Sequence, residues 1–150
     1  MLQVGDSFPL LEGKNQEGEI VKLESFLGKP LVVFFYPRAS TPTCTIEAKS
    51  LRDGYSDLKS RGYEVIGVSA DTVAKQKNFH SKNELPYDLI ADENQEFVEA
   101  FGVWQEKKNF GKTYMGIVRT TFVFDEAGVC IRVIEKVNSR EAAAQILENS

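Results

Sequence analysis

The sequence predicts an α/β domain built on a mixed sheet. Segments typical of buried strands alternate with segments of helical periodicity as far as residue 101, and two strand-like segments and a helix close the chain. Such alternation indicates parallel strands joined by helices, to which a closing hairpin adds antiparallel strands. The 150 residues fit one domain, residues 1–150, with a sizeable core.

The elements follow from local patterns. Residues 10–11 and 20–23 flank a turn with Gly and Asn and predict a small hairpin, and residues 31–36 are continuously apolar, as in a strand buried on both faces. A helix over 42–61 comes next. The remaining elements are strands at 63–69 and 87–91, helices at 73–82 and 94–101, strands at 120–124 and 129–137 joined by a turn at 125–128, and a last helix capped by Ser139.

A lone cysteine lies at the start of the helix that follows the first buried strand. Pro37 ends that strand, Thr41 is a suitable N-cap, and Pro42 suits the first helical position. Cys44 is then the third helical residue, and it lies on the apolar stripe of the helix. This position is beyond the carboxyl end of a central strand, where open α/β sheets usually have their sites.

The first turn of a helix favours a thiolate, which is the nucleophilic form of cysteine. Unpaired N–H groups and the positive end of the helix dipole lie close to the sulfur of Cys44, and the Thr41 hydroxyl can donate to it. An inert core cysteine is the commoner role of a lone cysteine. A cysteine in that inert role needs no particular neighbours. The presence of Pro37, Thr41 and Pro42 beside Cys44 therefore favours a reactive thiol.

The segment around Cys44 resembles the active-site region of peroxiredoxins, and the bacterioferritin-comigratory, or Q-type, group in particular. Residues 36–47 read Tyr-Pro-Arg-Ala-Ser-Thr-Pro-Thr-Cys-Thr-Ile-Glu and follow Gly-Lys-Pro-Leu-Val-Val-Phe-Phe. Two further blocks agree, Gly-Asp-x-x-Pro at residues 5–9, and Phe-Gly-Val-Trp at 101–104 with the segment 111–125. The resemblance spans nearly the whole chain, in the expected order.

This resemblance implies a thioredoxin-like fold and a thiol peroxidase that reduces hydrogen peroxide and organic hydroperoxides. By it, Cys44 attacks the O–O bond and becomes a sulfenic acid, Thr41 binds the peroxide and the sulfur, and Pro37 covers the site. Arg119 holds the thiolate and stabilises the developing charge, for which an arginine's donors are well suited. Glu47 orients an arginine or another neighbour. Position alone would make Arg119 part of a surface salt bridge and Glu47 a solvated helix residue.

The chain departs from the Q-type pattern at two positions. Thr43 stands where members often have glycine, and Lys49 stands where many have a second, resolving cysteine. The remaining cysteine, Cys130, is expected to fill the sheet. We therefore predict a one-cysteine mechanism in which thioredoxin, glutaredoxin or a small thiol reduces the sulfenic acid. A Cys44–Cys130 disulfide is the alternative, although it needs Cα atoms within about 7 Å.

Composition excludes several other classes of function. The net charge is −4, so no nucleic-acid partner is expected, and the adjacent pair Lys107–Lys108 is interpreted as solvated surface. No apolar run approaches a membrane span and no secretory signal is legible, so we expect a cytoplasmic protein, a monomer or a weak homodimer.

No cofactor or metal is expected either. His80 is the one histidine, and no H-x-x-x-H or C-x-x-C spacing occurs. The absent C-x-x-C also disfavours a thioredoxin-like reductase. A peroxide sensor that uses the same residues remains an alternative to an enzyme.

Overall fold

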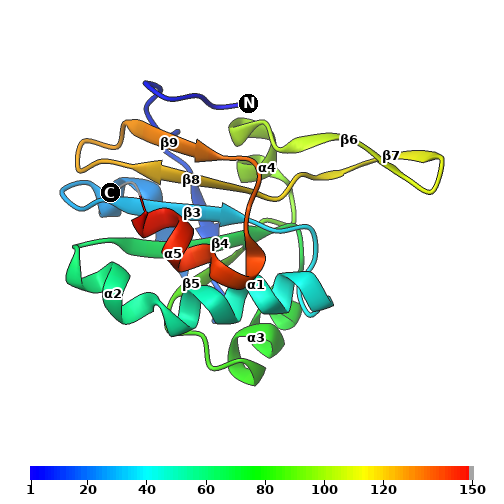
Figure 1. The fold of residues 1–150 in the computed structure, drawn as a ribbon, viewed down its shortest axis with the longest axis horizontal. Helices are drawn as coiled ribbons and strands as arrows, with labels where there is room; N and C mark the ends of the chain where they lie inside the picture. Colours follow the sequence, from blue (N-terminus) through cyan, green and yellow to red (C-terminus); the bar gives the residue numbers. More distant parts are fainter. Residues whose placement is uncertain (149–150) are drawn as a thin grey trace.

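The computed structural model describes residues 1–148, which form a central seven-stranded sheet in the order β2-β1-β5-β4-β3-β8-β9 and a separate hairpin, β6–β7. Helices flank the sheet (Figure 1). The strands are β1 (Glu12–Lys14), β2 (Ile20–Lys22), β3 (Leu31–Phe35), β4 (Glu64–Ser69), β5 (Asp88–Ala91), β6 (Trp104–Asn109), β7 (Lys112–Ile117), β8 (Thr120–Phe124) and β9 (Cys130–Ile134). The helices are α1 (Pro42–Asp53), α2 (Tyr55–Ser60), α3 (Val73–Lys82), α4 (Glu96–Phe101) and α5 (Ala142–Leu147), with short 3₁₀ turns at Leu23–Phe26 and Ser139–Glu141.

The middle of the sheet is parallel and its flanks are antiparallel. Strand β3 pairs in parallel with β4, and β4 with β5, while β8 and β1 run antiparallel to their neighbours. The predicted mixed α/β sheet is therefore confirmed. Because β3 and β4 are parallel, the loops that leave their carboxyl ends lie at the same edge.

The two faces of the sheet bury separate cores. Strand β3 is wholly buried and alternates between them: Val32 and Phe34 face one core, and Val33 and Phe35 face the other. The first core is covered by α1, α2, α3 and α5, which lie on one side of the sheet, and α4 covers part of the second core (Figure 1). This alternation is the period of a strand.

The long helix expected over residues 42–61 is in fact two helices, because Gly54 interrupts it. A Cβ atom on Gly54 would lie 2.2 Å from the Cβ of Ala143 in α5. Only glycine allows α5 to approach the α1–α2 junction this closely. The last helix also differs from expectation, since it begins as a 3₁₀ turn whose cap is Asn138 rather than Ser139.

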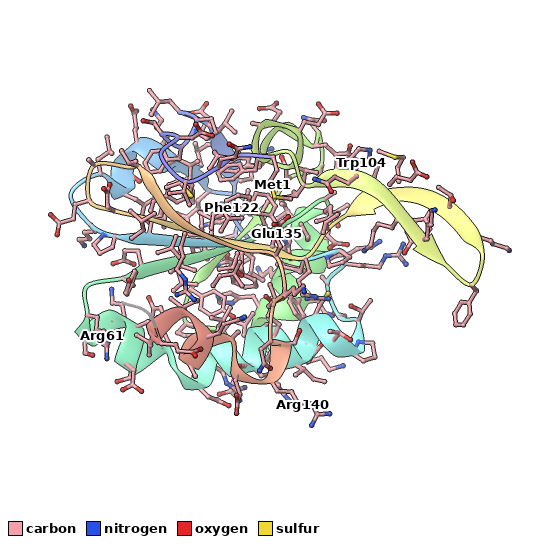
Figure 2. The ribbon with its side chains drawn as sticks, turned by 45° about the horizontal axis from the view of Figure 1, so that its top comes forward. Met1, Arg61, Trp104, Phe122, Glu135 and Arg140 are labelled. Atoms are coloured by element: carbon pink, nitrogen blue, oxygen red, sulfur yellow. The ribbon has the colours of Figure 1, made fainter. Side chains whose placement is uncertain are left out.

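Two hairpins differ from the prediction. The N-terminal hairpin pairs β1 with β2, and its first strand begins at Glu12, directly after the expected pair at 10–11. The β6–β7 hairpin was not predicted, because its strands are polar and lack alternating apolar residues. It projects from the body of the molecule, with Trp104 at its base (Figure 2). Its turn is made by Phe110 and Gly111, both at positive φ.

Candidate active site

Cys44 lies at the edge of the sheet where β3 ends. It is the third residue of α1, after the N-cap Thr41 and Pro42 at the first position, as the sequence predicts. Its side chain is only 2% exposed. The sulfur is therefore shielded from bulk water.

The guanidinium of Arg119 links the cysteine to a buried carboxylate. Its Nη2 donates to the Cys44 sulfur at 3.2 Å, and its Nη1 donates to Oε1 of Glu47 at 2.5 Å. The two acceptors lie one turn apart on α1, whereas Arg119 comes from the short link between β7 and β8. The fork geometry of arginine serves both acceptors at once, and it places a positive charge beside the sulfur.

Glu47 is fully buried, so it is not the solvated helix residue that its position alone allows. Its Oε1 bonds to Arg119, whereas its Oε2 has no hydrogen-bond partner among the described residues. Burial raises the pKa of the Glu47 carboxyl to about 7, against the opposing effect of the Arg119 charge. The carboxyl thus holds Arg119 in place and can itself change protonation near neutral pH.

The Thr41 side chain is directed away from the helix backbone. Its hydroxyl donates to the Arg38 carbonyl at 3.0 Å and not, as expected, to the Cys44 sulfur. It also makes no capping bond to the first turn of α1. The lone pairs of that hydroxyl oxygen remain able to accept a hydrogen bond from a ligand that carries an O–H group. The N–H groups at the start of α1 also lack this cap and can face a developing negative charge near Cys44.

The loop before α1 is tied to the neighbouring strand by Asp71, a residue for which sequence reasoning gave no active-site role. The Asp71 Oδ2 atom accepts the backbone N–H of Ala39 at 2.8 Å and the hydroxyl of Ser69 at 2.6 Å. Ser40, next in the loop, has φ at +64°, a conformation that non-glycine residues rarely adopt. The position of Asp71, just after a strand parallel to β3, is the signal that could have identified it.

A cavity of about 720 Å³ lies at the start of α1 and is lined by Thr41, although Cys44 itself is not part of its lining. It lies between the β3–α1 loop, which contributes Pro37 and Thr41, and the base of the β6–β7 hairpin, which contributes Trp104 and Lys107. The interpretation of the pair Lys107–Lys108 as solvated surface holds for Lys108 but only in part for Lys107. Its chain is partly buried and its Nζ donates to the Ile117 carbonyl at 3.0 Å, while Lys108 is exposed.

Cys130 is buried in β9 as expected, but on the opposite face of the sheet from Cys44. Cys44 belongs to the core beneath α1, and Cys130 packs with Phe8 and Phe124 in the other core. Burial raises the pKa of the Cys130 thiol, which keeps it protonated. The layer of strands between the two sulfurs would have to rearrange before they could bond.

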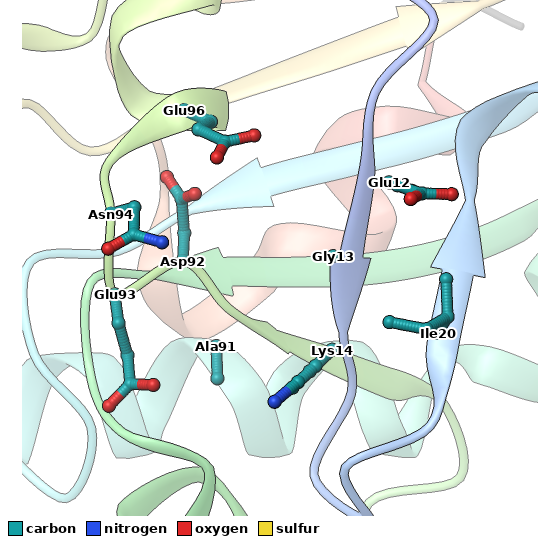
Figure 3. Close-up of a pocket in the computed structure, with 9 residues that line it drawn as sticks. All are labelled: Glu12, Gly13, Lys14, Ile20, Ala91, Asp92, Glu93, Asn94 and Glu96. Carbon is teal, nitrogen blue, oxygen red and sulfur yellow. The ribbon is translucent and has the colours of Figure 1, made fainter.

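A second hollow, of about 270 Å³, lies between β1–β2 and the start of α4 (Figure 3). Carboxylates line it, but Asp92 accepts the N–H groups of Phe97 and Val98 and so caps α4. Within residues 1–148, no three His, Cys, Asp or Glu side chains are grouped to hold a metal ion. His80 lies partly buried on α3, and none of the candidate catalytic residues lines this hollow.

Comparison with known proteins gives matches over nearly the whole chain. The model of the AhpC/TSA family matches residues 4–133. The protein named peroxiredoxin Bcp of Bacillus subtilis is 42% identical over 147 residues, which cover 98% of this chain and 94% of that protein. No helix in the described part of the chain has the length and apolar character needed to cross a membrane.

Solved structures from Xanthomonas campestris share the fold. A cysteine-to-serine mutant of its peroxiredoxin Q superposes with a TM-score of 0.90 at 30% identity, covering 99% of this chain and 95% of that one. Its bacterioferritin comigratory protein, studied for alkyl peroxide reduction, gives a TM-score of 0.89 at 29% identity with the same coverage. The expected thioredoxin-like arrangement, a mixed sheet flanked by helices, is thereby confirmed.

Proposed function

Because the chain belongs to the AhpC/TSA family and is a thiol-dependent peroxidase of the peroxiredoxin Bcp (Q-type) group, we propose that Cys44 is the thiolate that cleaves its peroxide substrate. The sulfur attacks one peroxide oxygen, an S–O bond forms and the O–O bond breaks. The leaving oxygen takes up a proton and departs as water or an alcohol. Sulfur is oxidised by two electrons to the sulfenic acid, and the peroxide is reduced by two.

The contact between Arg119 and the Cys44 sulfur carries the proposal. Arg119 favours the thiolate before the reaction and donates to the oxygen on which negative charge develops. Glu47 holds the arginine in that orientation. Thr41 binds the peroxide through its hydroxyl, with the help of the free N–H groups of the first turn of α1.

Two prolines shape this site. Pro37 forms a wall of the cavity and limits the access of water to the thiolate. Pro42 starts α1 without adding an unpaired N–H group.

Recycling uses an external thiol. Position 49 is lysine, and Cys130 lies in the other core, so neither is suited to attack the Cys44 sulfenic acid. One reductant thiol displaces water to give a mixed disulfide, and a second thiol releases Cys44 as the reductant becomes a disulfide. Thioredoxin, glutaredoxin or a small thiol of a reducing cytoplasm supplies these electrons. The substrates are hydrogen peroxide and organic hydroperoxides, in keeping with the alkyl peroxide reduction of the Xanthomonas campestris protein.

Peroxide consumption with an added thiol system tests the assignment of Cys44. We expect turnover by the wild-type protein and by Cys130→Ser, and none by Cys44→Ser. Turnover by Cys44→Ser at the wild-type rate would show that another group attacks the peroxide.

The recycling route is tested by mass measurement after one equivalent of peroxide. A one-cysteine mechanism predicts a sulfenic acid that dimedone captures, equally in the wild type and in Cys130→Ser. A rapid loss of two hydrogens within the wild-type monomer, absent from Cys130→Ser, would instead demonstrate a Cys44–Cys130 disulfide.

A further inference from the structure

The cavity at the start of α1 is positively charged, although the chain as a whole is acidic. Its charged lining consists of Arg38, Lys75 and Lys107 against the carboxylate of Asp71, whereas the chain carries a net charge of −4. The Asp71 carboxylate already accepts hydrogen bonds from the Ser69 hydroxyl and the Ala39 N–H. A cavity of this sign concentrates anions near its mouth.

Lys107 differs from the other two cations in being partly buried. Arg38 and Lys75 are exposed, so solvent and salt screen their charges. The Lys107 chain lies across Gly116, where an added Cβ would be 3.2 Å from its Cδ, and its Nζ is anchored on the Ile117 carbonyl. Gly116 therefore provides the space in which the lysine reaches the cavity from β6.

Within residues 1–148, the Lys107 ammonium has no carboxylate partner, whereas Lys22, Lys29, Lys59 and Lys77 each do. It bonds one carbonyl, which leaves two of its three N–H donors. It lines the same cavity as Pro37 and Thr41, and it is close enough to Arg119 and Cys44 to interact electrostatically with both. Two donors of this ammonium are therefore available to an anion in the cavity, as charge-assisted hydrogen bonds.

The remaining lining of the cavity is mixed, with polar groups from Thr41, Gln95 and Tyr114 beside a set of apolar side chains. Trp104 and Ile117 belong to the base of the hairpin, Met115 lies along β7, and Pro37 lies opposite, on the loop before α1. A ligand that fits this lining combines a hydrocarbon part with a negative group. Hydrogen peroxide has neither feature, so the lining indicates selection among organic peroxides.

We propose that Lys107 binds the carboxylate of an anionic organic hydroperoxide while the peroxide group of the same molecule meets Cys44. The hydrocarbon part contacts Trp104 and Ile117. This inference rests on the proposed function, because it names the substrate class of that site. Lys107 is thus a specificity-determining residue: it favours a carboxylate-bearing hydroperoxide over an uncharged one of similar shape.

The test compares cumene hydroperoxide with its para-carboxylate derivative, which differ by one charged group. The second-order rate constant of Cys44 oxidation is measured for each in a single turnover, by loss of titratable thiol. Lys107→Met removes the charge and keeps the length of the chain. Lys108→Met is the matched control, since that lysine is adjacent but exposed.

We expect the ratio of the two rate constants, carboxylate over uncharged, to fall about tenfold in Lys107→Met and to keep its wild-type value in Lys108→Met, as the loss of one charge-assisted hydrogen bond implies. In the wild type, the ratio should also decrease with added salt. If Lys107→Met is poorly folded, Lys107→Gln provides the same comparison.

An unchanged ratio in a folded Lys107 variant overturns the inference. This includes an equal loss for both peroxides, which would mean that the lysine acts on the thiolate alone. Failure of the wild type to lose the Cys44 thiol with any peroxide, hydrogen peroxide included, refutes the proposed function itself and the inference with it.

Discussion

Replacing Glu47 by glutamine should change how the stability of the protein depends on pH. Glu47 is fully buried, one of its oxygens has no hydrogen-bond partner within residues 1–148, and burial raises the pKa of its carboxyl from 4.5 to about 7. Between these values the folded protein holds a proton that the unfolded chain releases. Stability contributed by this group is therefore fully present below pH 4.5 and is lost as the pH rises through 7.

The size of the effect follows from the interval between the two pKa values. About 2.5 pH units at about 1.36 kcal/mol each give about 3 kcal/mol, which is a large part of the stability of a typical domain. Glutamine keeps the shape of the side chain and an oxygen that can accept from Arg119, but it does not titrate. Its amide adds an offset in stability that is the same at every pH.

Urea unfolding of the reduced protein at pH 4.5 and pH 8 measures this difference. We expect Glu47→Gln to gain about 3 kcal/mol relative to the wild type between the two pH values. Glu99→Gln, at an exposed position of α4, is the control and should follow the wild type. If the free energy of unfolding changed equally between the two pH values in Glu47→Gln and in the wild type, the reasoning would be refuted. Glu47 would then not take up a proton in the folded state.

Two further substitutions test the site and the packing beneath it. Arg119→Met should lower the rate constant of Cys44 oxidation by about 10²–10³-fold, as loss of one transition-state donor does, while the exposed Arg140→Met keeps the wild-type rate in the same peroxide assay. Gly54→Ala should destabilise the fold by about 1–3 kcal/mol in urea unfolding, because its Cβ meets Ala143, and adding Ala143→Gly should restore part of the loss. No rescue by that second change would mean that the clash is not the cause.

Local patterns predicted the elements that carry strong signals. The helix over Val73–Lys82 has the predicted bounds, and Thr41 and Pro42 begin α1 where the capping pattern indicates. Both depend on short-range preferences, which act similarly in any fold. The break at Gly54 is different, because it reflects contact with α5, about ninety residues later in the chain.

The environment of Lys107 could not be predicted from local sequence patterns, because it depends on strand pairing. In the sequence it is half of a lysine pair in a polar segment, and such a pair is usually solvated. Strand pairing in the β6–β7 hairpin instead puts Lys107 opposite Tyr114 and over Gly116, facing the cavity. Neighbouring residues on a strand point to opposite faces, so Lys107 and Lys108 meet different surroundings.

By itself, the sequence determined the position of Cys44 at the start of a helix, after a strand buried on both faces, because helix caps, prolines and apolar runs act over a few residues. The tertiary structure alone decided which distant groups reach that thiol. Pairing of β3 with β8 brings Arg119 to Cys44 across 75 residues, and burial leaves Glu47 with a raised pKa. The sheet also separates Cys130 from Cys44, since alternate strand residues face opposite cores.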